Sequence, residues 1–283
     1  MSEITHVSDT AFWVAVYRAE ESRRKDALFH DPWAERLSGD RGRNIASRMH
    51  HRRYTAWSVV IRTCIIDRFL EEKIAEGADT VINLGAGLDT RPYRLKLPPN
   101  LRWIEADYPH MIDFKNEALK DETPTCRLER IAVDLSNDES RKTLLTKLGA
   151  GTKKAVVLTE GVTPYLTVEQ VGKLADDLKA QPTFRYWVLD YFSPLILSFF
   201  QKNKKRMEQM KNAPFQFNPP DWFAFYDQHG WKVEQMRYFV EESLRLGRRF
   251  PTPWWSKLTA LWAGPRKREA FRRLVGYAVL EPK

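Results

Sequence analysis

Cysteine is scarce in this sequence of 283 residues, and several catalytic signatures are missing. Cys64 and Cys126 are the only cysteines, and they lie far apart without a CxxC spacing. This argues against a disulfide framework or a thiolate metal site and favours a reducing compartment, so we expect a cytoplasmic protein. No HExxH motif, Ser-His-Asp ordering or carboxylate pair at helical metal-ligand spacing stands out. Hydrolase and metalloenzyme functions therefore have no support, and no metal is expected.

Long apolar runs are missing as well. The N-terminal segment carries charges on both sides of a short apolar stretch, and the later run "YFSPLILSFF" is short and contains Pro194. Neither is typical of a signal peptide or a membrane span, so we expect a soluble chain. Its length and its 43% hydrophobic content predict a single folded domain over residues 1–283.

Basic residues outnumber acidic ones, giving a formal charge of +9 and a pI near 9.5. The basic clusters "SRRK", "HHRR", "KNKKR" and "RKR" are scattered along the chain. Such charge can attract nucleic acid or anionic surfaces, but scattered basic residues more often form a solvated surface. We therefore expect no nucleic-acid partner.

Short β-branched or aromatic runs alternate with segments of helical spacing. In residues 167–180, five apolar residues fall on one helical face behind Thr167 as N-cap: Val168, Val171, Leu174, Ala175 and Leu178. The alternation predicts an α/β fold whose parallel sheet is covered on both faces, with ligands at the carboxyl ends of the strands. Two late runs would bring the sheet to seven strands. The runs cover residues 80–84, 101–107, 129–135, 154–160, 184–192, 231–240 and 274–282.

Two regions fall outside this alternation. Residues 1–78 predict an N-terminal helical region with a long amphipathic helix over residues 54–77. Residues 193–230 and 241–273 are rich in aromatic, proline and basic residues. These two segments predict cap insertions over the ligand edge of the sheet.

The first run ends in a glycine turn, Gly85-Ala86-Gly87, within "TVINLGAGLDTRPYR". A strand followed by GxG lets the backbone approach a ligand closely. The third glycine of a dinucleotide fingerprint is replaced by Thr90, and no GK[ST] follows, so a phosphate loop is disfavoured. A plain strand-to-helix turn is the alternative.

Carboxylates close three successive runs: Asp107, Asp134 followed by Leu135, and Glu160. Because parallel strands end at one edge of a sheet, these side chains should share a rim. Together they suit a ligand with a ribose, an exocyclic amine and a cationic centre, as in S-adenosylmethionine. For each carboxylate taken alone, a helix N-cap or a surface ion pair remains the alternative.

The motifs "VINLGAGLDTRPYRL", "WIEADYP", "AVDL", "TEGVTPYLT" and the N-terminal "RAEESRRKDALFHDPWAERL" resemble the leucine carboxyl methyltransferase family. The resemblance is to its bacterial branch of mycobacterial and polyketide-type O-methyltransferases, and it covers roughly residues 10–174. It implies a Rossmann-like, seven-stranded class I methyltransferase sheet with N-terminal helices and a helical cap. It also implies S-adenosyl-L-methionine as the methyl donor.

The resemblance further implies cofactor-binding roles for individual residues. Arg62 would face the cofactor carboxylate, with an ion pair to Asp67 or Glu71 as the alternative. Asn83 occupies a position where many methyltransferases carry a carboxylate. The resemblance places the remaining residues along the cofactor: Gly85, Ala86 and Gly87 would contact the methionine portion, Asp107 the ribose, and Asp134 and Leu135 the adenine, while Glu160 would lie beside the cofactor.

The acceptor is less well defined by the sequence. We expect an O-methyltransferase that modifies a carboxylate or hydroxyl of a small apolar or aromatic molecule. The alternatives are a nucleic-acid methyltransferase, a methyltransferase for protein C-terminal carboxyl groups, and a catalytically idle binding protein. A carboxylate acceptor needs no general base, so no catalytic residue is predicted. For a phenol, His229, Tyr165 or His110 are candidate bases, with packing or surface roles as the alternative.

Aromatic and basic residues in the predicted cap segments suit an apolar acceptor with an anionic group. Alternatively, the rings form the cap's own core or a contact with another protein or a membrane surface. The residues concerned are Phe215, Phe217, Trp222, Phe223, Trp254, Trp255 and Trp262, with Arg245, Arg248 and Arg249.

Overall fold

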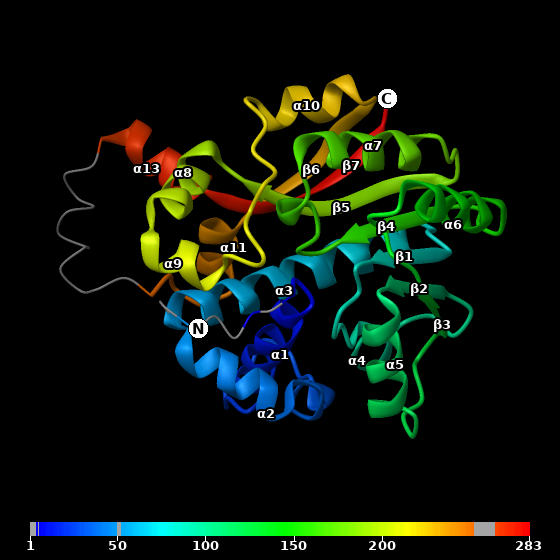
Figure 1. Cartoon of the computed structure of the whole chain (residues 1–283), viewed down its shortest axis with the longest axis horizontal. Helices are drawn as coiled ribbons and strands as arrows, with labels where there is room; N and C mark the ends of the chain where they lie inside the picture. Colours follow the sequence, from blue (N-terminus) through cyan, green and yellow to red (C-terminus); the bar gives the residue numbers. More distant parts are fainter. Residues whose placement is uncertain (1–3, 5, 50–51, 252–263) are drawn as a thin grey trace.

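The computed structural model describes residue 4 and residues 6–49, 52–251 and 264–283, which contain one central seven-stranded sheet (Figure 1). Its strands are β1 (Thr80–Leu84), β2 (Arg102–Asp107), β3 (Arg127–Ala132), β4 (Ala155–Thr159), β5 (Phe184–Phe192), β6 (Trp231–Tyr238) and β7 (Val275–Pro282). The order across the sheet is β3-β2-β1-β4-β5-β7-β6. The first five strands pair in parallel, as their alternation with helices predicts, so the expected α/β sheet is confirmed.

Helices cover both faces of this sheet (Figure 1). The N-terminal helices are α1 (Asp9–Ser22), α2 (Pro32–Arg48) and α3 (Arg52–Ala75). Those that follow are α4 (Arg91–Arg94), α5 (Pro109–Ala118), α6 (Asp138–Ala150), the 3-10 turn η1 (Thr163–Tyr165), α7 (Val168–Lys179), α8 (Pro194–Lys202), α9 (Lys204–Gln209), α10 (Trp222–Gln228), α11 (Phe239–Arg245) and α13 (Pro265–Arg272). Buried side chains of α6, α7 and α10 pack on one face, and those of α3, α8 and α11 pack on the other.

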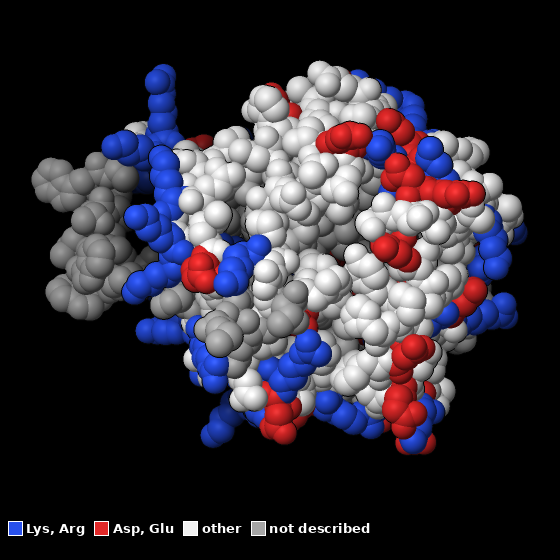
Figure 2. All heavy atoms as spheres, in the orientation of Figure 1, with Lys and Arg blue, Asp and Glu red and all other residues white. Residues whose placement is uncertain are grey.

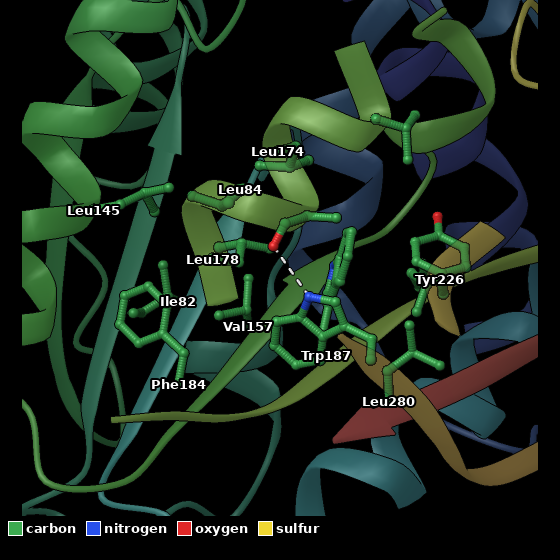
Figure 3. Packing of buried hydrophobic residues seen from close by; sticks show 14 of the residues in the cluster. Ile82, Leu84, Leu145, Val157, Leu174, Leu178, Phe184, Trp187, Tyr226 and Leu280 are labelled. Carbon is green, nitrogen blue, oxygen red and sulfur yellow. Dashed lines mark hydrogen bonds between the residues drawn. The ribbon is translucent and has the colours of Figure 1, made fainter. Parts of the chain in front are cut away.

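The alternation of side chains along β1 shows how the two cores arise. Ile82 and Leu84 point to the face covered by α6 and α7, whereas Val81 points to the face covered by α3. Each large apolar side chain that is fully buried in this way contributes roughly 1.5–3 kcal/mol. Figure 3 shows the first of these cores, where β1, β4, β5 and β7 meet α6, α7 and α10 through Ile82, Val157, Phe184, Trp187, Leu280, Leu145, Leu174, Leu178 and Tyr226.

Helix α7 begins at the predicted cap. The Thr167 side chain accepts a hydrogen bond from the Gln170 backbone N–H, and the Gln170 side chain accepts one from the Thr167 N–H. This reciprocal capping box satisfies two backbone donors that the first helical turn leaves unpaired. Val171, Leu174, Ala175 and Leu178 are buried as predicted, but Val168 is 37% exposed because it lies in the first turn, outside the buried stripe.

The third strand corrects one expectation. It was predicted as a buried strand over residues 129–135, but β3 spans Arg127–Ala132 and each of its residues is exposed or half-buried. The strand lies at the sheet edge and pairs with β2 alone. Asp134 and Leu135 therefore lie in the loop beyond the strand.

Strand β7 is inserted antiparallel between β5 and β6, an arrangement that the sequence pattern did not predict. The insertion sets Tyr277 directly opposite Asp190 of β5. The C-terminal segment thereby contributes a side chain to the same region of the molecule as the parallel strand ends.

The N-terminal helices pack beside the glycine turn. Arg18 of α1 forms an ion pair with Asp31, the residue that caps α2, and also donates to the Leu88 carbonyl oxygen. Thr90 donates to the same Asp31 carboxylate at 2.6 Å. These buried contacts join α1 and α2 to the loop that follows β1. None of the described helices is both long enough and apolar enough to span a membrane.

Candidate functional site

A cavity of about 280 Å³, here called the rim cavity, lies at the carboxyl ends of β1, β2, β4 and β5. Its floor is the sheet edge with the loops that follow these strands, and α1 and α3 contribute the opposite wall. This is the place where a parallel α/β sheet binds its ligand. Seven of the eight predicted site residues line it: Arg62, Gly85, Ala86, Gly87, Asp107, Leu135 and Glu160.

The glycine turn is tightly constrained by its neighbours. Gly85 has φ +71° and Gly87 has φ +47°, the left-handed region that disfavours side chains. A Cβ on Gly85 would lie 2.5 Å from Val162 Cγ2, and one on Gly87 would lie 3.1 Å from Ala11 Cβ. Glycine is therefore required here both by backbone conformation and by the close approach of helix α1 and of the loop that follows β4.

Asp107, the last residue of β2, lines the rim cavity. Its two carboxylate oxygens accept hydrogen bonds from the backbone N–H groups of Gly87, at 2.6 Å, and Tyr108, at 2.7 Å. Burial raises the pKa of Asp107, although these hydrogen bonds oppose the shift. Each oxygen keeps capacity for a further donor, so the carboxylate can hold the vicinal hydroxyls of a ribose.

Glu160 connects the cavity to a buried charge network. Its carboxylate lies 2.9 Å from Arg62 Nε and 2.7 Å from Arg91 Nη1. Burial opposes its ionisation, but the Arg91 and Arg62 guanidinium groups outweigh burial and lower the pKa of Glu160. Arg62 is thus paired with Glu160, and neither of the alternative partners, Asp67 and Glu71, takes that place.

Asp67 belongs to the same charge network but does not line the rim cavity. It forms ion pairs with Arg91 at 2.6 Å and Arg94 at 2.7 Å. Arg91 also contacts Asp89 at 2.7 Å, and Asp89 accepts from the Asn83 amide. The polar residues of "LDTRPYR" are therefore mainly structural, because they fix the glycine turn against α3 and the end of β4.

Asp134 is the predicted site residue that does not line the rim cavity. It is exposed, and its carboxylate accepts hydrogen bonds from the backbone and hydroxyl of Ser136 in its own loop. Leu135 and Ser136 do line the cavity. The loop therefore reaches the cavity, but the Asp134 carboxylate is bound to Ser136 of the same loop, so its contact with the adenine stays a prediction.

Asp190 is a site residue that the sequence analysis missed. It lines the cavity, is 4% exposed, and accepts hydrogen bonds from the Tyr277 hydroxyl and the Gly161 N–H. Burial raises the pKa of Asp190 to about 6, against the opposing effects of Tyr277 and Arg62. The signal was present, because Asp190 stands near the end of the fifth strand as Asp107 does at the second.

Of the three candidate bases, Tyr165 alone lines the cavity. Burial raises the pKa of its phenol, so the hydroxyl stays protonated at neutral pH. His229 is paired with Asp176 at 2.6 Å on the α7 side of the sheet, and His110 stacks on Tyr108 near Ser8. Neither histidine is a lining residue, so the structure gives no support to a histidine base.

The predicted cap aromatics separate into different environments. Phe215 lines the rim cavity, while Phe217 and Trp222 are buried in the core against α7 and β5, as the alternative interpretation proposed. Phe223 is 44% exposed. Trp254, Trp255 and Trp262 lie outside the described residues. Helix α10 itself packs on the sheet face.

The predicted cap arginines do not line the cavity. Arg248 pairs with Glu21 and Asp26, and Arg245 pairs with Glu242. Arg249 is exposed. The partner of Arg245 lies three residues away in sequence, whereas the two partners of Arg248 are more than 200 residues away and meet it only in the fold.

A second cavity of about 460 Å³, here called the side chamber, adjoins the rim cavity. The two share Tyr54, Phe200, Arg206, Met210 and Val275 among their lining residues. The other described residues around the side chamber are mainly apolar and come from α3, α8, α11 and α13. The chamber thus extends the rim cavity away from the glycine turn into an apolar space.

Residues 11–179, more than half of the chain, match the family model described as leucine carboxyl methyltransferase. The chain belongs to this family. A Frankia alni protein named as an S-adenosyl-L-methionine-dependent methyltransferase is 33% identical over 264 residues, covering 86% of this chain and 90% of that protein. A Mycobacterium tuberculosis protein of the same name is 33% identical over 226 residues, covering 73% of this chain and 63% of its own.

Solved structures of similar fold include a DUF574 family protein from Streptomyces avermitilis, with TM-score 0.58 and 14% identity over 95% of this chain and 97% of that one. Magnesium protoporphyrin IX methyltransferase from Synechocystis, solved with bound S-adenosylhomocysteine, has TM-score 0.51 and 12% identity over 86% and 94% of the two chains. These likenesses support the class I methyltransferase fold. The family and its relatives confirm the prediction of an S-adenosylmethionine-dependent methyltransferase.

Proposed function

We propose that this methyltransferase transfers the methyl group of S-adenosylmethionine to an oxygen atom of a small apolar molecule. The proposal rests on the position of the apolar side chamber directly beside the rim cavity: aromatic residues such as Tyr54 and Phe200 line both. A concave, mainly apolar space of this kind suits a small acceptor better than a macromolecular surface. We infer that residues 1–283 act as one domain, in which region 1–78 covers the rim cavity and parts of segments 193–230 and 241–273 line the chamber.

The residues of the rim cavity fit S-adenosylmethionine. The buried Asp107 carboxylate suits the ribose hydroxyls, and the glycine turn leaves backbone close to the methionine portion. Asn83 Oδ1 is buried and has no hydrogen-bond partner among the described residues, so it suits the cofactor's ammonium group. Arg62 offers a guanidinium to the cofactor carboxylate. The Leu135 backbone and, as a prediction, the Asp134 carboxylate would serve the adenine.

When bound, the cofactor supplies an electrophilic methyl group on a sulfonium sulfur. The contribution of the chain is then alignment of the acceptor oxygen and exclusion of water, which can account for much of a methyltransferase's acceleration. A carboxylate acceptor is already ionised at neutral pH and requires no general base. Tyr165 lines the same cavity and stays protonated at neutral pH, so its hydroxyl would be available to the acceptor as a hydrogen-bond donor.

Calorimetry with S-adenosylhomocysteine tests the cofactor assignment. Asp107→Ala should weaken binding by about tenfold or more, since hydrogen bonds to a charged group contribute roughly 1.5–3 kcal/mol. Asp113→Ala, an exposed change on α5, is the matched control. Unchanged affinity in Asp107→Ala would refute the assignment of the ribose site.

The acceptor class is tested separately by transfer of isotopically labelled methyl to panels of carboxylic acids, phenols and alcohols. Methyl esters or methyl ethers support O-methylation, whereas products methylated only on nitrogen or carbon contradict it. Cofactor binding without turnover of any acceptor would favour a binding protein.

One observation favours a nucleic-acid acceptor as a second candidate. Lys and Arg side chains gather over α8, α9 and α13 at the left of Figure 2, whereas the opposite end carries both signs. A nucleic-acid methyltransferase should bind RNA or DNA with affinity that falls steeply as salt rises. We expect no such binding, because the side chamber is lined mainly by apolar residues.

A further inference from the structure

Arg206 of α9 occupies the junction between the two cavities and lines both. Its guanidinium carbon lies 3.8 Å from the centroid of the Phe200 ring and 5.3 Å from that of Phe215. The side chain is half-buried. Stacking on rings holds the planar guanidinium while leaving its N–H edge available for an acceptor.

Among the arginines that line the rim cavity, Arg206 is exceptional in its charge balance. It forms no ion pair with any carboxylate in the part of the chain that the structure describes. The other three are each neutralised inside the protein, as Arg18 with Asp31, Arg62 with Glu160, and Arg141 with Asp177.

A guanidinium that is even partly removed from water without a counter-charge is unfavourable, because the loss of hydration is not offset by a partner. Aromatic stacking compensates only in part. The arrangement is explained when an anionic ligand completes it. A carboxylate matches the two parallel N–H groups of a guanidinium, so carboxylate is the preferred chemistry.

The surroundings of Arg206 define the rest of the ligand. The side chamber is lined mostly by apolar side chains, including Ile196, Phe239 and Phe250. Leu195 and Phe199, which also line it, are 62% and 57% exposed, so the chamber has an apolar rim toward solvent. A ligand placed here would bury a hydrocarbon or aromatic body while its charged end meets Arg206 beside the cofactor cavity.

We propose that the methyl acceptor is an amphipathic carboxylic acid, whose carboxylate pairs with Arg206 and whose apolar body lies in the side chamber. This inference rests on the proposed function, since it names the substrate class of the same site. Arg206 is then a specificity-determining residue, which selects acids over uncharged molecules of the same shape.

The test measures binding to the full chain saturated with S-adenosylhomocysteine. Octanoate, dodecanoate and phenylbutanoate are each compared with the corresponding alcohol by calorimetry. We expect at least one acid to bind about tenfold or more tightly than its alcohol, as a charge-assisted hydrogen-bond pair predicts. Arg206→Met should remove that preference, and Arg206→Lys should keep part of it.

Lys205→Met is the matched control, because it removes one positive charge from an exposed neighbour on the same helix that lines neither cavity. It should retain the preference for acids. Cooperative unfolding of Arg206→Met establishes that the variant is folded.

Each outcome decides a separate question. Failure of S-adenosylhomocysteine to bind the wild-type chain would refute the proposed cofactor site. Cofactor binding with equal affinity for acid and alcohol in every pair, or a preference that survives in Arg206→Met, would overturn the role of Arg206 alone.

Discussion

Arg62 Nε lies 2.9 Å from Glu160 Oε1, so the guanidinium predicted to face the cofactor carboxylate is already held by a carboxylate of the rim cavity. The two residues come from α3 and from the loop after β4. Arg91 lies 2.7 Å from the other Glu160 oxygen, and Asp67 anchors Arg91 in turn. The orientation of Arg62 is therefore set by a network that extends well beyond the cavity.

Arg62→Met should reduce the affinity for S-adenosylhomocysteine by about tenfold or more, because a charge-assisted contact with the ligand carboxylate is lost. Calorimetry measures the change. Arg68→Met, on the same helix but exposed and paired with Glu72, is the control and should bind normally. If Arg62→Met binds S-adenosylhomocysteine as tightly as Arg68→Met does, the assignment of Arg62 to the cofactor carboxylate is wrong.

Asp67→Asn should lower the free energy of unfolding by about 3–5 kcal/mol at neutral pH, because Arg91 and Arg94 are left buried with a partner missing. Burial opposes ionisation, but Arg94 and Arg91 outweigh it and lower the pKa of Asp67. Its contribution should therefore be present at neutral pH and be lost as pH falls through the lowered pKa. Denaturant unfolding measures this, and the exposed change Glu71→Gln is the control. Equal losses in the two variants would show that the ion pairs of Asp67 with Arg91 and Arg94 do not stabilise the fold.

Gly85→Ala should destabilise the protein more than Gly77→Ala. Both glycines have positive φ, but an added Cβ meets Val162 Cγ2 at 2.5 Å in the first case and nothing within 4 Å in the second. Gly77→Ala should cost about 1–2 kcal/mol for the left-handed backbone alone, and the clash should add to this in Gly85→Ala. Adding Val162→Ala should recover only the clash. Chemical denaturation separates the two costs, and equal losses at both glycines would exclude a steric role for Val162.

Asp190 should make stability depend on pH in the opposite sense to Asp67. Burial raises its pKa in the native state to about 6, above the usual value of 3.8, so the native state holds the proton more tightly than the unfolded chain. The resulting stabilisation is present below the unfolded pKa and is lost as pH rises through about 6, amounting to about 3 kcal/mol. Asp190→Asn should remove this decline.

The role of Asp190 is tested by measuring the free energy of unfolding of the wild type and of Asp190→Asn between about pH 4 and pH 7. Asparagine can keep the contacts with Gly161 and Tyr277, because the tyrosine hydroxyl can accept as well as donate. Asp113→Asn on the surface of α5 should follow the wild-type curve. Parallel curves for wild type and Asp190→Asn would show that Asp190 does not titrate in this range.

Local pattern was sufficient for most of the architecture. Short runs such as "TVINL" and "AVVLT" are typical of a buried parallel strand, because they are mostly apolar, rich in β-branched residues and bounded by polar or glycine residues. The same reasoning wrongly predicted that β3 is buried, because the exposure of a strand depends on whether other strands pair with one or both of its edges. The position and direction of β7 depend on contacts across most of the chain, which a local pattern does not encode.

The residues of the candidate site also fall into two groups, those that local sequence pattern predicted and those whose contacts depend on the tertiary structure. The sequence by itself determined the glycine turn, Asp107 and Glu160, because their strands end at one edge and chain order alone brings such ends together. Only the tertiary structure decided that Glu160 holds Arg62, that Asp134 turns to its own loop, and that Tyr277 meets Asp190. It also distinguished Arg248, which pairs with Glu21 and Asp26, from Arg206, which has no carboxylate partner among the described residues. Charge pairing is decided by distance in space, and residues far apart in sequence supply most of the partners.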